Sequence, residues 1–204
     1  MKKIVKQNVG LDLSKKDFKA CISVKFIEKG KERIKIEGTG KFTNDLKGFT
    51  KFMNWVIKKN KGAINFENTY FTLEATGVYY ENLAYFLYDH GYYVSVLLPN
   101  KSNAYAKSLN IKTKTDKVDA KMLAQMGLER SLELWQPLSS AMCTIRKLCR
   151  ERGQLIKVRT QEKCRLEAEK NSHESQDDII ERKKNHIQYL TEQIKAVEKQ
   201  IKNK

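Results

Sequence analysis

The order of the predicted secondary structure is the feature that most constrains how this chain folds. Residues 4–13, 17–27 and 31–42 alternate apolar and polar side chains, which predicts three β-strands. The connections between them are short, which favours antiparallel pairing of consecutive strands. After residue 44 helical patterns alternate with further strands. A meander followed by this alternation predicts an α/β fold with a mixed sheet and helices on its faces.

The later elements follow from periodicity and from capping residues. Asn44 is a preferred N-cap residue, and it precedes apolar side chains at helical spacing. Gly91 and Pro99 predict the ends of a helix and of a strand. Helices are thus predicted at 45–59, 78–90, 100–109 and 116–130, and strands at 69–75 and 92–98.

The pattern changes again after Pro137. Residues 138–170 carry an apolar helical stripe, and a polar break follows at 171–178. Isoleucine then recurs every seven residues, at Ile180, Ile187, Ile194 and Ile201. This is the a/d spacing of a coiled coil. We therefore predict a domain at 1–135 and, at 136–204, a long α-helical hairpin or coiled-coil arm that also offers a seam for a homo-oligomer. A solvated charged helix is the alternative.

The charge of the chain indicates its class of partner. It contains 40 Lys and Arg against 24 Asp and Glu, a formal net charge of +16. Such an excess favours a polyanion, because neutralised phosphates release condensed counterions. A general lysine bias is the alternative explanation. The sequence has no apolar run of about 18 residues and no Cys-x-x-Cys pair. We expect reduced cysteines, no membrane partner and a cytoplasmic location.

Acidic side chains at the ends of predicted elements are the candidates for chemistry. Asp12 lies among apolar neighbours near the end of the first strand, where an unpaired charge costs several kcal/mol. Glu74 ends a buried strand, and Asp116 and Asp119 share one face at a helix start. Such carboxylates can converge on Mg²⁺, which takes oxygen ligands and commonly keeps a substrate phosphate. The alternatives are an N-cap for Asp116, an exposed helix residue for Asp119 and a surface-facing strand end for Glu74.

Three motifs occur in order in this sequence. They are GLDLSK, then LEATGVYYENLAYFLYDHGYYVSVLLPN, then KTKTDKVDAKMLAQMG. Together with the Phe42-Thr43-Asn44 segment and Gly48, they closely resemble the Asp-Glu-Asp-Asp transposases of insertion sequences. These are relatives of the pilin-gene invertase that carry a RuvC-like domain, and several are guided by a bridge RNA. The resemblance spans about residues 7–130.

The resemblance implies a ribonuclease-H-like (RuvC-like) fold and a function in DNA transposition and site-specific recombination. The family's acidic motif residues match Asp12, Glu74, Asp116 and Asp119. In the family these line a divalent-metal site for Mg²⁺ or Mn²⁺ that acts on DNA phosphodiesters. The implied partners are DNA and a guide RNA.

Family members continue beyond the helical segment into a domain with a serine thought to attack DNA. The 204 residues do not contain that domain, and Ser172 and Ser175 have no catalytic context. We therefore expect incomplete recombination by this chain alone. A non-cleaving nucleic-acid-binding and dimerisation module is the alternative function.

Basic and aromatic residues complete the predicted site. Lysines that flank the acidic motifs are assigned to phosphate binding: Lys15, Lys16, Lys101, Lys112, Lys114, Lys117 and Lys121. Solubilising surface charge is their alternative role. Tyr79, Tyr80 and Tyr105 are candidates for stacking on nucleobases, although core packing is the preferred interpretation for Tyr79 and Tyr80.

Overall fold

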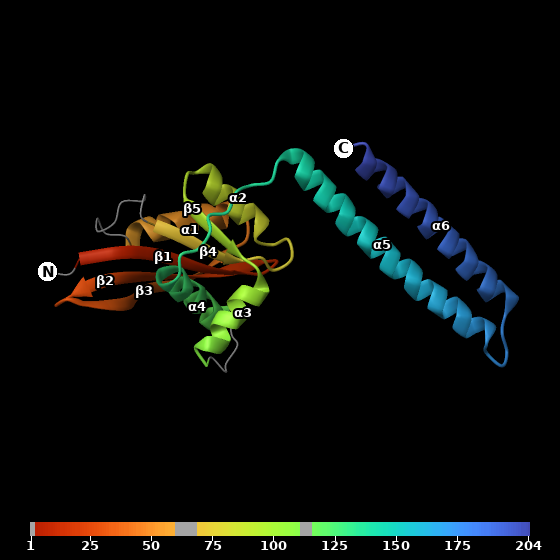
Figure 1. Cartoon of the computed structure of the whole chain (residues 1–204), viewed down its shortest axis with the longest axis horizontal. Helices are drawn as coiled ribbons and strands as arrows, with labels where there is room; N and C mark the ends of the chain where they lie inside the picture. Colours follow the sequence, from red (N-terminus) through yellow and green to blue (C-terminus); the bar gives the residue numbers. More distant parts are fainter. Residues whose placement is uncertain (1–2, 60–68, 111–115) are drawn as a thin grey trace. The chain divides into compact units, whose positions relative to one another are not determined.

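The computed structural model describes residues 3–59, 69–110 and 116–204, and the side chains of Lys3, Asp116 and Lys117 lie outside the described part. The chain forms two compact units, Met1–Pro137 and Leu138–Lys204 (Figure 1).

The first unit contains a five-stranded sheet in the order β3-β2-β1-β4-β5. Strands β1 (Lys3–Leu13), β2 (Asp17–Glu28) and β3 (Lys31–Thr43) form an antiparallel meander. Strand β4 (Thr69–Glu74) runs parallel to β1, and β5 (Tyr93–Leu97) runs parallel to β4. This order and these directions are those of a ribonuclease-H-like sheet. The predicted α/β class with a mixed sheet is confirmed.

The helices of this unit lie close to their predicted positions. They are α1 (Leu46–Lys59), α2 (Glu81–Asp89), α3 (Pro99–Ser108) and α4 (Asp116–Glu129). The largest difference is at α2, because residues 77–80 form a turn before the helix begins. Boundaries of this kind are the least certain part of a prediction from sequence.

Helices α1 and α2 cover one face of the sheet (Figure 1). Alternation along β1 directs Val9 and Leu11 into this core, where they are fully buried. Phe52 of α1 packs edge-on against Phe18, with 5.2 Å between ring centroids. Each such fully buried side chain contributes about 1.5–3 kcal/mol to folding.

Helix α4 covers the opposite face and lies in very close contact with β1. A Cβ atom at Gly10 would lie 2.2 Å from the carbonyl oxygen of Ala120 and 2.2 Å from the nitrogen of Ala124. Further back along β1, the Asn8 amide donates to the Ala124 carbonyl at 3.2 Å, and its side chain adjoins Gly127. Helix α4 therefore runs antiparallel to β1, with its first turn toward the C-terminal end of that strand.

The N-cap of α1 is Asp45, so the prediction that Asn44 caps this helix is wrong. The Asp45 Oδ1 atom accepts a hydrogen bond from the Gly48 backbone N–H at 2.7 Å. The Asn44 Nδ2 group instead donates to the carbonyl oxygens of Ser14 at 2.9 Å and Tyr79 at 3.0 Å. Asn44 thereby joins the β1–β2 turn to the segment after β4.

The second unit is an antiparallel hairpin of α5 (Ser140–Lys170) and α6 (Asp177–Lys202), as the heptad pattern predicts (Figure 1). Its apolar contact surface buries Leu166, Leu190, Ile194 and Val197. The predicted stripe is not buried at the start of α5, where Met142 is 51% exposed. Within the described residues, no helix is both long enough and apolar enough to cross a membrane.

One buried carboxylate lies between the two helices of the hairpin. Glu162 of α5 forms an ion pair with Arg165 at 3.2 Å on the same helix. It also faces two residues of α6, with Lys183 Nζ at 3.7 Å and His186 Nδ1 at 3.9 Å. The carboxylate therefore links α5 to one particular stretch of α6.

Candidate metal and nucleic-acid site

Asp12 and Glu74 lie at the ends of two neighbouring parallel strands. The last residue pair between β1 and β4 is Leu11 with Leu73, and each acidic residue comes directly after it. Leu11 and Leu73 both point into the core beneath α1 and α2, so alternation places Asp12 and Glu74 on the face that α4 covers. Neighbouring strands are about 4.8 Å apart. The fold thus brings these two predicted site residues to one edge of one face.

The Glu74 carboxylate is held by two hydroxyl groups. Ser102 Oγ donates to Glu74 Oε2 at 2.5 Å, and Thr76 Oγ1 donates to Glu74 Oε1 at 3.2 Å. Ser102 lies on α3 and is fully buried. Because Glu74 pairs with Leu97 at the end of β5, the helix that follows β5 begins beside it. The sequence reasoning missed Ser102, whose position three residues after Pro99 is its only local signal.

Asp119 and Asp116 belong to the first turn of α4. Ala120, one residue after Asp119, contacts β1 at Gly10, two residues before Asp12 on the same face. The start of α4 therefore lies near the end of β1 that carries Asp12. Within the described residues no three His, Cys, Asp or Glu side chains are grouped so that they could hold a metal ion. The four-carboxylate metal site stays a prediction, since the Asp116 side chain lies outside that part.

The predicted phosphate-binding lysines occupy several elements. Lys15 and Lys16 are exposed in the turn between β1 and β2, next to Asp12. Lys101 is exposed in the first turn of α3, and Lys121 is half-buried on α4. Lys112, Lys114 and the side chain of Lys117 lie outside the described residues. The described lysines thus flank the acidic edge from three elements.

The tyrosines correct one prediction. Tyr105 is buried, and its hydroxyl donates to Glu129 Oε2 at 2.6 Å. Burial, and then the adjacent Glu129 carboxylate, raise the pKa of the Tyr105 hydroxyl. Tyr105 therefore has no face open to a nucleobase, and its predicted stacking role is wrong. Tyr80 is in the core at 6% exposure, while Tyr79 is 40% exposed.

Comparison with known protein families defines the class of the protein as a transposase. The family model of the IS110 type, described as a transposase, matches residues 9–169, and the chain belongs to this family. It is 36% identical over 161 residues to the pilin gene-inverting proteins of Moraxella lacunata and Moraxella bovis. Those matches cover 77% of this chain and 46% of each relative, so the chain spans about half the length of these relatives.

A solved structure is also similar to this chain. The RuvC structure of Thermus thermophilus aligns with a TM-score of 0.44 and 9% sequence identity. The alignment covers 63% of this chain and 99% of that chain.

Proposed function

We propose that this chain supplies the metal-dependent, RuvC-like part of a recombinase that cuts and joins DNA phosphodiesters. The observation that carries the proposal is the placement of Asp12 and Glu74 on one sheet face, each directly after the last β1–β4 pair. Membership of a transposase family supports DNA as the substrate.

The donor set suits a hard divalent cation. We assign Asp12, Glu74, Asp116 and Asp119 to Mg²⁺ or Mn²⁺, because carboxylate oxygens are the ligands that these ions take in proteins. When bound, such a cation would stabilise the negative charge that develops on phosphate oxygens during strand cleavage.

The residues of the chain itself perform the positioning. Ser102 and Thr76 fix the orientation of the Glu74 carboxylate by donating to its two oxygens. The missing side chain at Gly10 permits α4 to approach β1 closely, which brings Asp119 toward the Asp12 end of the strand. Lys15 and Lys16 supply positive charge at the same edge, where it favours a polyanionic substrate.

Metal binding tests the assignment directly. We expect Mn²⁺ titrated calorimetrically into the folded chain to bind, and the Asp12→Asn variant to lose at least about tenfold in affinity, about 1.4 kcal/mol. Asp89→Asn, an exposed carboxylate at the end of α2, is the matched control and should bind as the wild type does. Equal affinity of the wild type and Asp12→Asn would contradict the proposal.

The second candidate is a module that binds nucleic acid and dimerises through α5 and α6 without cutting. The net charge of +16 favours it. It predicts DNA binding that weakens steeply with salt and does not depend on Mg²⁺. Recognition of a guide RNA is a further proposal from the family resemblance, and a gel-shift titration with structured RNA against a length-matched unstructured RNA tests it.

A further inference from the structure

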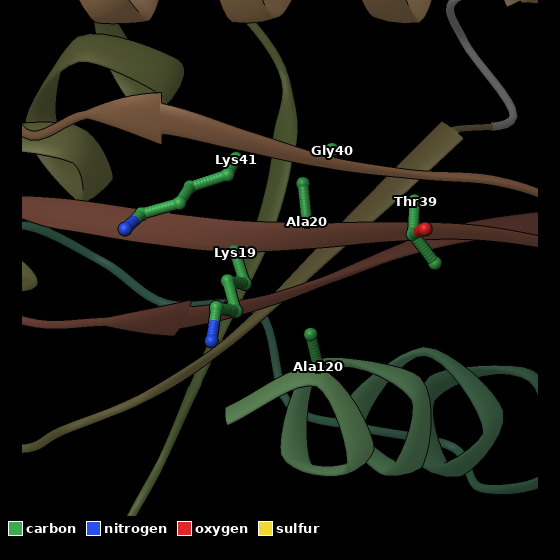
Figure 2. Close-up of a pocket in the computed structure, with 6 residues that line it drawn as sticks. All are labelled: Lys19, Ala20, Thr39, Gly40, Lys41 and Ala120. Atoms are coloured by element: carbon green, nitrogen blue, oxygen red, sulfur yellow. The ribbon is translucent and has the colours of Figure 1, made fainter. Parts of the chain in front are cut away.

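A pocket of about 290 Å³ lies beside the acidic edge, on the face of the sheet that α4 covers in part. Its lining comes from two strands and one helix: Lys19, Ala20, Thr39, Gly40, Lys41 and Ala120 (Figure 2). Helix α4 packs on β1 and β2, while β3 is the outer strand of the meander. The pocket therefore lies at the border between the part of the sheet face that α4 covers and the part at β3 that it does not cover.

Strand register places this pocket in line with the predicted metal site. Asp12 of β1 is directly opposite Lys19 of β2, and Lys19 is directly opposite Lys41 of β3. Residues directly opposite each other on adjacent strands point to the same face. Glu74, Asp12, Lys19 and Lys41 thus form one row across four strands, acidic at one end and basic at the other.

The basic end of this row concentrates like charges. Two lysines directly opposite each other on paired strands destabilise a sheet. Lys41 is exposed and forms an ion pair with Asp17 at 2.9 Å, an interaction of a kind worth about 0–1 kcal/mol. In Figure 2 the Lys41 side chain extends to the left along the strands, whereas the Lys19 side chain extends down toward the side of the sheet that carries Ala120. A phosphate group at this end of the row can accept hydrogen bonds from lysine ammonium groups.

We propose that this pocket binds the phosphodiester backbone of the nucleic-acid strand whose adjacent phosphate would contact the divalent cation assigned to Asp12 and Glu74. The inference rests on the proposed function and extends the substrate path away from the metal site. The exposed Thr39 hydroxyl adds a neutral donor to the lining. The lining residues described include no aromatic side chain, so bases gain no stacking partner there. Contacts of this kind position a strand without reading its sequence.

Salt-dependent binding of oligonucleotides tests the inference. The double variant Lys19→Gln/Lys41→Gln removes both ammonium groups, and Lys35→Gln is the control because Lys35 is exposed on the same strand as Lys41 and pairs with Glu37. For single-stranded DNA, the slope of log K against log salt is negative, and we expect the double variant to reduce its magnitude by about 1.4. Lys35→Gln should leave the slope unchanged, and matched RNA oligonucleotides show which strand chemistry uses the pocket.

A second measurement uses the wild-type chain alone. Bound oligonucleotide should protect Lys19 and Lys41, but not Lys35, from an amine-reactive reagent. Unchanged slopes with both DNA and RNA, or equal labelling of all three lysines, would overturn the inference. Mn²⁺ titration of the double variant separates the two proposals. If the double variant binds both Mn²⁺ and oligonucleotide as the wild type does, only the pocket proposal is refuted. If Asp12→Asn loses Mn²⁺ binding and the double variant does not, the metal site is supported independently of the pocket.

Discussion

The approach of α4 to β1 at Gly10 makes Gly10→Ala the most informative single substitution. The added Cβ would lie 2.2 Å from the Ala120 carbonyl oxygen, 2.2 Å from the Ala124 nitrogen and 2.9 Å from the Ala124 Cα. All three are backbone atoms of a helix, so no side-chain rotation relieves the overlap. The helix must move away from the strand by about 1 Å, because atoms of this kind do not approach within about 3 Å.

The cost of this movement has two parts. Overpacking of a close contact costs about 1–3 kcal/mol. The Asn8 to Ala124 hydrogen bond, which is 3.2 Å long, would lengthen beyond useful geometry, and its loss adds about 1 kcal/mol. We therefore expect Gly10→Ala to lower the free energy of unfolding by about 2–4 kcal/mol. The same movement shifts Asp119 relative to Asp12, so Mn²⁺ affinity should fall as well.

Urea unfolding followed by circular dichroism measures the first effect, and calorimetric titration measures the second. Gly38→Ala is the control in the same sheet, because its Cβ would meet the flexible end of Lys59 and the Trp55 ring at 3.3 Å. It should change stability by less than about 1 kcal/mol. If the midpoint urea concentration of Gly10→Ala equals that of the wild type, the close packing of α4 on β1 is refuted.

The other predictions concern side chains around the same edge. Ser102→Ala should leave the fold intact but weaken Mn²⁺ binding severalfold in calorimetry, since Glu74 loses its 2.5 Å donor, and Ser102→Thr should restore it. Asn44→Ala should lower the free energy of unfolding by about 1–3 kcal/mol in urea, from two lost hydrogen bonds, whereas exposed Asn54→Ala should be neutral. The hydrogen bond from the Gly48 N–H, and then that from the Thr43 hydroxyl, lower the pKa of the Asp45 carboxyl from its usual 3.8. The ionised carboxylate therefore stabilises the folded state above about pH 4, and this stabilisation is lost as the pH falls through the lower pKa of the folded state. Asp45→Asn should weaken this acid dependence in thermal melts, and an unchanged profile would refute the capping role.

Local patterns were sufficient for the elements and for their order. Alternation in β2 and the sevenfold isoleucine repeat of α6 are signals within one element, and the structure contains both elements as predicted. Two of the errors arose where a side chain bonds far along the chain. The acceptors of Asn44 are 30 and 35 residues away, and the partner of Tyr105 is 24 residues away. Local sequence propensities do not predict hydrogen-bond partners this far along the chain.

In the candidate site, too, local patterns identified some residues, whereas residues that depend on distant partners were missed. The acidic motifs identified Asp12 and Glu74, but their alignment depends on the β1–β4 register, which the sequence does not state. Lys19 and Lys41 were missed for a related reason. Each looks like an ordinary polar position on an alternating strand, and only the paired registers place them opposite each other and next to Asp12. The position of Ser102 next to Glu74 depends on the pairing of β5 with β4.

Glu162 limits how the two long helices can be aligned. A repeat of isoleucines every seven residues permits a helix to slide by one heptad while apolar side chains still meet. Such a slide would separate Glu162 from Lys183 and His186 by about 10 Å along the axis and leave a buried carboxylate without its partners across the hairpin. Arg165 of α5 would still pair with the carboxylate, but the loss of the partners on α6 makes that state less stable. Glu162 therefore favours one alignment of α5 and α6, as does the Arg152–Glu198 ion pair across the same hairpin.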